Sequence, residues 1–202
     1  ISPKAKHVLA YLDAGGQTQG MRTGTCFLAS QAAFDSFDRK CLAVVPGKPN
    51  ILLIGDSHGA HYYPGLVAAL PDANILQATA SGCKPLRSDH GEKRCVELMH
   101  YIFSQFIPNT KLDGVVISTP DHTHFHIARA AIERGKHVYL EKPLAHSVWE
   151  VRELTKLAAA KGVATQLGVQ RHAQGPLRRA VELIHSGAIG AVNAVITIGR
   201  LI

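Results

Sequence analysis

Residues 50–59 read Asn-Ile-Leu-Leu-Ile-Gly-Asp-Ser-His-Gly, and this stretch decides the fold class. A short run of large aliphatic residues that ends at a glycine is typical of a strand buried on both faces of a parallel sheet. We therefore predict a strand over Asn50–Gly55. Residues 58–70 follow as a predicted helix, which ends before Pro71. The same alternation of strand and helix continues through most of the chain.

Further along, short apolar runs alternate with longer amphipathic segments. We predict strands over Asn74–Ala80, Gly114–Ser118, His137–Glu141, Val163–Gly168 and Val192–Ile198. We predict helices over residues 95–107 and 121–134, from the cap Ser147 to Gly162, and from Pro176 to Gly187. Ser147 and Glu150 form a capping-box pattern. This order predicts an α/β fold, with a doubly wound, mostly parallel sheet of about six strands in a three-layer sandwich of the Rossmann or flavodoxin type.

The composition is that of a globular protein. The 202 residues are 46% hydrophobic and 18% charged, which suits one large or two small domains. No apolar run approaches the roughly 20 residues needed to cross a bilayer. The net charge is +7, but the lysines and arginines are scattered and are not interleaved with aromatic residues. We therefore expect a solvated basic surface and no nucleic-acid partner.

All four cysteines, Cys26, Cys41, Cys83 and Cys95, lie in the first half of the chain. None has the spacing of a zinc ribbon. An even number in one half indicates two disulfides, which we assign as Cys26–Cys41 and Cys83–Cys95, and an oxidising, extracytoplasmic compartment. Four reduced thiols in a cytosolic protein are the alternative.

The chain carries different signals on the two sides of residue 113, and we interpret it as two half-domains joined there. Residues 1–46 read as a lead-in segment, residues 47–112 as the first half and residues 113–202 as the second. The join falls on a predicted core strand, so we expect the halves to share one continuous sheet. The chain does not begin with methionine, and we expect it to be part of a longer protein.

Four stretches of the first half carry a family resemblance. They are Thr-Cys-Phe-Leu at 25–28, Leu-Leu-Ile-Gly-Asp-Ser-His at 52–58, Gln-Ala-Thr-Ala-Ser-Gly-Cys-Lys-Pro at 77–85, and Asp-Gly at 113–114. Over about residues 1–118 the chain resembles the SGNH hydrolase domain of membrane O-acyltransferases that act on cell-envelope polysaccharides. The resemblance implies that Ser57 is the nucleophile, that the N–H groups of Ser57 and Gly82 form an oxyanion hole, and that no cofactor is required.

The first half departs from that family in its catalytic base. The family uses a histidine in a late Asp-x-x-His motif, which has no counterpart here, and a serine without a base is a weak nucleophile. We therefore expect an impaired esterase or O-acetyl-transfer fragment, with His122 or His124 as a speculative substitute base. We expect contact with a membrane only through an acyltransferase region that would precede this chain. Asp56 and Ser57 also fit a plain helix cap.

Two stretches of the second half resemble another family. They are Val-Val-Ile-Ser-Thr-Pro-Asp-His-Thr-His at 115–124 and Gly-Lys-His-Val-Tyr-Leu-Glu-Lys-Pro at 135–143. Over about residues 112–198 the chain is similar to the Gfo/Idh/MocA oxidoreductases, whose first domain is a Rossmann fold that binds NAD(P). The resemblance implies cofactor contacts from Thr119, Pro120, His124, Glu141, Lys142 and Gln170. It also places Lys142 at the substrate as a catalytic residue.

The glycine-rich turn of a dinucleotide site is altered in this sequence. Gly-x-Gly-x-x-Gly is expected after the first strand, and Gly55-Asp-Ser-His-Gly59 stands there instead. Asp56 would bring negative charge near the phosphates, and His58 would add bulk. The family's C-terminal domain, which carries substrate contacts, is also missing from the sequence.

His122, His124 and His126 invite a metal site, but no carboxylate or cysteine completes a ligand set, so we predict none.

The sequence is consistent with three functions. The first is the SGNH-type hydrolase or acyl-transfer fragment, which we rank above the second for ancestry because it covers more residues and keeps its nucleophile, although the third describes present activity best. The second is an NAD(P)-dependent sugar oxidoreductase fragment, and the third is a catalytically inactive hybrid domain. All three leave a small molecule or saccharide as the expected partner, and the oligomeric state undetermined. A redox function favours the cytoplasm, whereas the cysteines favour the periplasm or the cell exterior.

Overall fold

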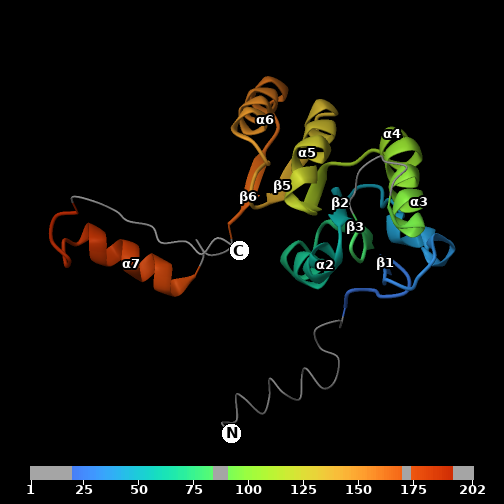
Figure 1. Ribbon diagram of the computed structural model, residues 1–202, viewed down its shortest axis with the longest axis horizontal. Coiled ribbons are helices and arrows are strands. Elements are labelled where there is room, and N and C mark those ends of the chain that lie inside the picture. The colour runs from blue at the N-terminus through green and yellow to red at the C-terminus, as the bar shows by residue number, and fades with distance from the viewer. Residues whose placement is uncertain (1–19, 84–90, 170–173, 193–202) are drawn as a thin grey trace, which may run out of the picture. The chain divides into compact units, whose positions relative to one another are not determined.

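The computed structural model describes residues 20–83, 91–169 and 174–192, and its main feature is a six-stranded parallel sheet (Figure 1). The strands are β1 (Phe27–Leu28), β2 (Asn50–Gly55), β3 (Asn74–Ala80), β4 (Gly114–Ser118), β5 (His137–Glu141) and β6 (Thr165–Gly168). They lie side by side in the order β1-β3-β2-β4-β5-β6. The predicted fold class, a doubly wound α/β sheet of the Rossmann type, is confirmed.

Helices connect the strands. They are α2 (Ser57–Ala69), α3 (Lys93–Tyr101), the π-helical turn η3 (Ile102–Phe106), α4 (Ile107–Asn109), α5 (His124–Glu133), α6 (Val148–Lys161) and α7 (Gly175–His185). Three short 3-10 turns are η1 (Phe34–Ser36), η2 (Arg39–Leu42) and η4 (Asp121–Thr123). The chain divides into two units, residues 1–167 and 168–202. The second unit contains α7, an amphipathic helix that begins beside Pro176.

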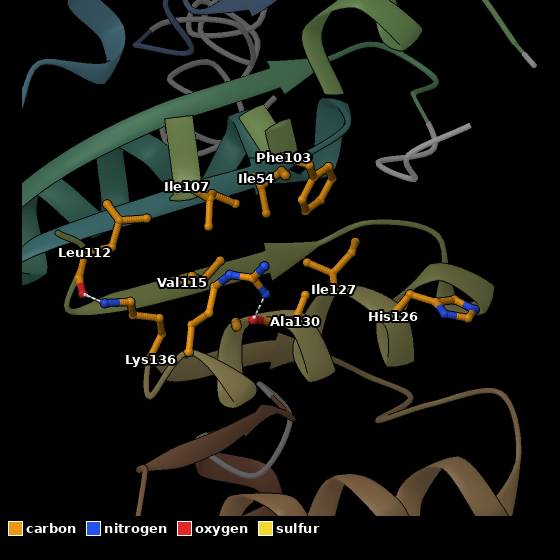
Figure 2. A pocket seen from close by; sticks show the side chains of 11 residues that line it. Ile54, Phe103, Ile107, Leu112, Val115, His126, Ile127, Ala130 and Lys136 are labelled. Atoms are coloured by element: carbon orange, nitrogen blue, oxygen red, sulfur yellow. Dashed lines mark hydrogen bonds between the residues drawn. The ribbon is translucent and has the colours of Figure 1, made fainter. Parts of the chain in front are cut away.

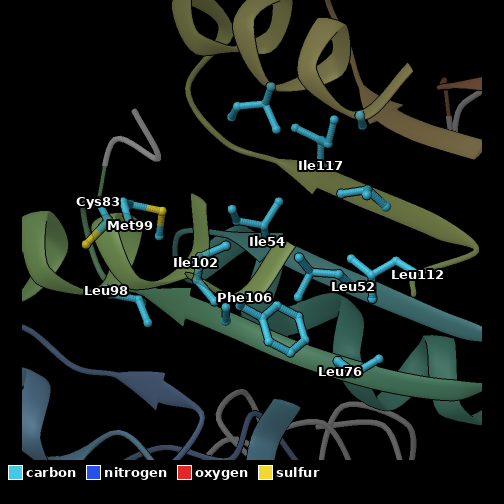
Figure 3. Packing of buried hydrophobic residues seen from close by; sticks show 14 of the residues in the cluster. Leu52, Ile54, Leu76, Cys83, Leu98, Met99, Ile102, Phe106, Leu112 and Ile117 are labelled. Atoms are coloured by element: carbon cyan, nitrogen blue, oxygen red, sulfur yellow. The ribbon is translucent and has the colours of Figure 1, made fainter. Parts of the chain in front are cut away.

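The two faces of the sheet are covered by different helices. Along β2, Leu52 and Ile54 point into a large core with side chains from α3, η3, α5 and α6 (Figure 3). Ile51 and Leu53 point to the other face, where they pack with Tyr62 and other residues of α2. This period of two is the alternation expected of a strand that is buried on both faces.

The segment before β2 contributes more to the fold than its sequence indicates. β1 pairs in parallel with the end of β3, and Phe27 lies opposite Thr79. Cys26, Phe37 and Leu42 are buried in or beside the core. We predicted no element over residues 20–46, because a strand of two residues shows no periodicity that a sequence pattern can detect.

Other boundaries differ in detail. The predicted helix over residues 95–107 is three pieces, since its backbone widens into the π-turn η3. Apolar residues spaced three to four apart favour an α-helix and a π-turn equally, so the sequence pattern did not distinguish them. The predicted last strand, Val192–Ile198, lies almost entirely outside the described residues.

Both predicted disulfides are present. Cys26 is bonded to Cys41 and Cys83 to Cys95, and they enclose short stretches of chain, with sequence separations of 15 and 12. Within the described ranges, no helix is both long and apolar enough to cross a membrane.

Candidate functional site

The connections of β2 and β4 leave the sheet in opposite directions at its carboxyl edge. β2 is followed by α2 and then β3 on one side, whereas β4, β5 and β6 extend the sheet on the other side. In doubly wound sheets, ligands bind in the crevice at such a switch point. We use the term carboxyl edge for residues 55–59, 118–124 and 141–143, which follow β2, β4 and β5.

The β2–α2 turn packs tightly against the end of β4. Gly55 lies opposite Ser118 in the parallel register, and a Cβ atom on Gly55 would stand 2.2 Å from the Ser118 carbonyl oxygen. A Cβ on Gly59 would meet Ser118 and Thr79 at 3.4 Å. Gly55 therefore allows the close approach of strand and turn, and Gly59 the close approach of helix and sheet.

Asp56 caps α2. Its Oδ1 accepts a hydrogen bond of 2.8 Å from the His58 backbone N–H, and its own N–H donates to the Ser118 carbonyl at 3.2 Å. Ser57 is the first residue of the helix, and His58 points to solvent with 85% of its side chain exposed. The turn thus presents a carboxylate at the positive end of a helix.

The loop after β4 is held by His124, whose side chain is buried with 1% exposure. Its Nδ1 lies 2.5 Å from the Pro143 carbonyl oxygen and its Nε2 lies 2.9 Å from the Thr119 carbonyl oxygen. The imidazole therefore ties the loop after β4 to the loop after β5. Because both ring nitrogens face backbone carbonyls, His124 cannot serve as the substitute base for Ser57.

The loop after β5 carries the predicted Glu141 and Lys142. Glu141 Oε1 accepts a hydrogen bond of 2.5 Å from the Tyr62 hydroxyl on α2. Lys142 is exposed at the sheet edge, and its peptide bond to Pro143 is cis. Sequence reasoning missed Tyr62, which is separated from Glu141 by 79 positions in the chain. Burial, followed by the nearby Glu141 carboxylate, raises the pKa of Tyr139 above its ordinary value.

Of the remaining predicted residues, Thr119 lies at the carboxyl edge, whereas Gly82 and Gln170 are not part of it. Thr119 bonds to Thr123 across the η4 turn at 2.7 Å. Gly82 follows β3 with a left-handed φ of 64°. Gln170 lies outside the described residues. His122 and His126 are exposed while His124 is buried, and the described part of the chain has no group of three His, Cys, Asp or Glu side chains able to hold a metal ion.

An apolar cavity of about 230 Å³ lies elsewhere, between α5 and the η3–α4 segment (Figure 2). Ile54, Ile107, Val115 and Ile127 line it, among others. At one end Arg134 and Lys136 donate hydrogen bonds to backbone carbonyls. None of the predicted site residues lines this cavity, so we assign it to core packing and not to the site.

The sheet order, the switch point and the two loops joined by His124 define a Rossmann-type domain. Comparison with known proteins gives the family. The sequence model of the Gfo/Idh/MocA oxidoreductase family, described as an NAD-binding Rossmann fold, matches residues 66–169, slightly more than half of the chain. The chain belongs to this family.

Individual relatives and solved structures are consistent with this family. The uncharacterized oxidoreductase YdgJ of Escherichia coli is 29% identical over 69% of this chain and 40% of its own length. The scyllo-inositol 2-dehydrogenase (NAD(+)) of Bacillus subtilis is 34% identical over 65% of this chain and 38% of its own. A crystal structure of an NAD-binding protein from Listeria innocua shares the fold with a TM-score of 0.55 at 21% identity, covering 71% of this chain and 40% of that one. The match to each of these three proteins spans about two fifths of their length.

These findings correct the sequence analysis. The family match runs from Leu66 in α2 to Val169 and crosses residue 113 without interruption. The resemblance to SGNH hydrolases, the esterase or acyl-transfer function based on it and the interpretation as a hybrid of two families are therefore wrong. A buried strand followed by a glycine turn and a helix is common to many α/β folds, so Gly-Asp-Ser carried less information than we assigned to it.

Proposed function

We propose that this chain is the dinucleotide-binding part of an NAD(P)-dependent oxidoreductase that acts on a small polyol or sugar. The observation that carries the proposal is the Glu141-Lys142-Pro143 loop of a family member, which follows β5 at the carboxyl edge, one strand away from the switch point. His124 fixes this loop to β4 and Tyr62 fixes it to α2. Such bracing is what a loop needs to hold a reactive group in one place.

The residues of the edge have distinct roles in this proposal. Lys142 is exposed and carries a positive charge, so it can hold or polarise a substrate hydroxyl oxygen. Glu141, oriented by Tyr62, would hold the ribose that adjoins the nicotinamide. Thr119 and Pro120 form the facing wall after β4. A bound nicotinamide ring supplies or accepts the hydride.

The substrate class is inferred from relatives. One of them is by name a scyllo-inositol dehydrogenase, and inositols are small polyols. Because the chain spans about two fifths of these relatives, we infer that the complete reaction needs residues beyond those that match. Gln170 stays a predicted cofactor contact.

The structure fits a dinucleotide unevenly. The loops after β4 and β5 offer polar groups at the switch point, and Gly55 and Gly59 give the β2–α2 turn its close packing. The residues between these glycines do not match the pattern. Asp56, Ser57 and His58 stand where a glycine would let the backbone approach a pyrophosphate.

The test is a map of NADH and NADPH binding by ¹H–¹⁵N NMR on the whole chain. We expect the amide signals of Gly55–Gly59, Thr119–Thr123 and Glu141–Lys142 to shift. Asp113 and Lys136 immediately precede β4 and β5, at the amino ends of these strands, and serve as internal controls. Shifts that appear only at those controls would overturn the proposal. So would the absence of shifts with millimolar cofactor, if it persists in a variant that lacks the Asp56 charge.

The role of Lys142 is tested with a matched pair of variants. Lys142→Met removes the charge after β5, and Lys136→Met removes a charge just before the same strand. We expect only the first to change the cofactor-induced shifts of Glu141 and of the Thr119–Thr123 loop. Equal effects of the two variants would argue against a place for Lys142 in the site.

A further inference from the structure

We propose that Asp56 sets the charge selectivity of the β2–α2 turn and that its carboxylate limits the affinity of this chain for a pyrophosphate-containing ligand. The inference rests on the proposed function, since it concerns the same site.

The backbone of the turn retains two of the three roles that glycines play in dinucleotide sites. Gly55 lets the turn lie against Ser118, and Gly59 lets α2 lie against the sheet. The third role, exposure of bare backbone to the pyrophosphate, is missing because side chains occupy the intervening positions. The backbone packing of the turn is therefore that of a phosphate-binding turn. The side chains at positions 56–58 are not suited to a phosphate group.

Asp56 acts through both its hydrogen bond and its charge. The carboxylate already accepts the His58 N–H, one of the helix donors that would otherwise face an anion. Its side chain is only 16% exposed, so solvent screens the charge incompletely. Among the described residues, the one ion-pair partner of Asp56 is His58, at 3.4 Å and itself 85% exposed. A pyrophosphate placed here would meet an anion at short range.

The chain offers a clean way to remove the charge. Asparagine caps helices about as well as aspartate, so Asp56→Asn should keep α2 and its first hydrogen bond while removing the negative charge. Asp38 provides a matched control. It caps η2 through a 2.8 Å bond to the Lys40 N–H, away from the carboxyl edge.

The experiment measures the affinities of NADH, ADP and adenosine for the wild-type chain, Asp56→Asn and Asp38→Asn by NMR titration at low salt. We expect Asp56→Asn to strengthen NADH and ADP binding about tenfold and to leave adenosine, which lacks phosphate, unchanged. We expect no change in Asp38→Asn. The gain should shrink when the salt is raised, because added ions screen the repulsion in the wild type.

The outcomes separate the two proposals. Equal NADH affinity in the wild type and in Asp56→Asn, with shifts at the carboxyl edge, would overturn this inference and leave the proposed function in place. A similar gain for adenosine would also overturn it, because the effect would then not come from phosphate charge. If neither protein binds NADH or ADP at millimolar concentration, both proposals fail.

Discussion

Gly55 shows that the absence of a side chain can matter as much as any functional group. A Cβ atom at position 55 would lie only 2.2 Å from the Ser118 carbonyl oxygen. This oxygen also accepts a hydrogen bond from the Asp56 N–H. Any side chain at position 55 must push β2 and β4 apart. The strand pair at the switch point therefore depends on this glycine.

We expect Gly55→Ala to destabilise the protein by about 3 kcal/mol, because the backbone neighbour cannot move without breaking the sheet. Gly65→Ala is the control. Gly65 lies exposed inside α2, a Cβ there meets nothing within 4 Å, and we expect it to stabilise by about 0.5–1 kcal/mol. Urea denaturation measures both. Equal effects of the two substitutions would mean that β2 and β4 do not pack as closely as described.

A second residue-scale prediction concerns Tyr139. Burial and then Glu141 raise the pKa of Tyr139 above 10.0 in the folded protein. The folded state therefore holds this proton more tightly than the unfolded state, and stability falls as the pH rises from about 10 through the folded pKa. We expect Tyr139→Phe to lose less stability than the wild type between pH 9 and about 11. Parallel stability curves for the two proteins would contradict the assignment.

At the scale of elements, the helix starts could be predicted and the contacts between elements could not. Ser147 and Glu150 form the capping box that their spacing predicts, and Asp56 caps α2. These are local hydrogen bonds between residues two or three apart, so the sequence alone determines them. The Tyr62–Glu141 bond joins α2 to the end of β5, and no local pattern indicates which side chains will meet across a sheet.

We expect Tyr62→Phe to cost about 1 kcal/mol, because it removes one hydrogen bond to a carboxylate and keeps the packed ring. Tyr63→Phe is the neighbouring control on α2. The Tyr63 ring lies 4.8 Å below the Arg22 guanidinium, a contact that phenylalanine preserves, so we expect little change. Thermal unfolding distinguishes the two. A larger loss in the Tyr63 variant would show that the hydroxyl bond to Glu141 is not the stronger connection.

At the scale of the whole molecule, alternation of apolar runs predicted the class of fold and the main strands, but not the unity of the chain. Two motifs that resembled different families suggested a join at residue 113. The family match across residue 113 overturns the two-family origin. The sheet itself is continuous across the supposed join, as expected, since β2 and β4 pair from Ile51 to Gly55. A continuous sheet is expected of a hybrid joined at a core strand as well as of a single family, so the predicted fold could not reveal that the two motifs were misassigned.

This continuity gives a test of cooperativity for residues 20–167. Both disulfides lie before residue 96, whereas the single tryptophan, Trp149, lies on α6 with its ring 5.6 Å from Phe125. In the loop-closure model, disulfides that enclose such short loops stabilise by about 3 kcal/mol each. If the sheet unfolds as one unit, a reductant should lower the urea midpoint seen by Trp149 fluorescence by about 2 M or more.

The paired Cys→Ser variants at 26 and 41, and at 83 and 95, control for effects of the reductant itself and should each give part of the shift. A Trp149 midpoint that stays fixed while far-ultraviolet circular dichroism shows an earlier transition would mean that the region around α6 unfolds independently. In that case the pairing of β2 with β4 would contribute too little free energy to couple the two sides of the sheet. A common shift of both signals would mean that bonds confined to the first half stabilise the second, which requires the sheet to transmit them.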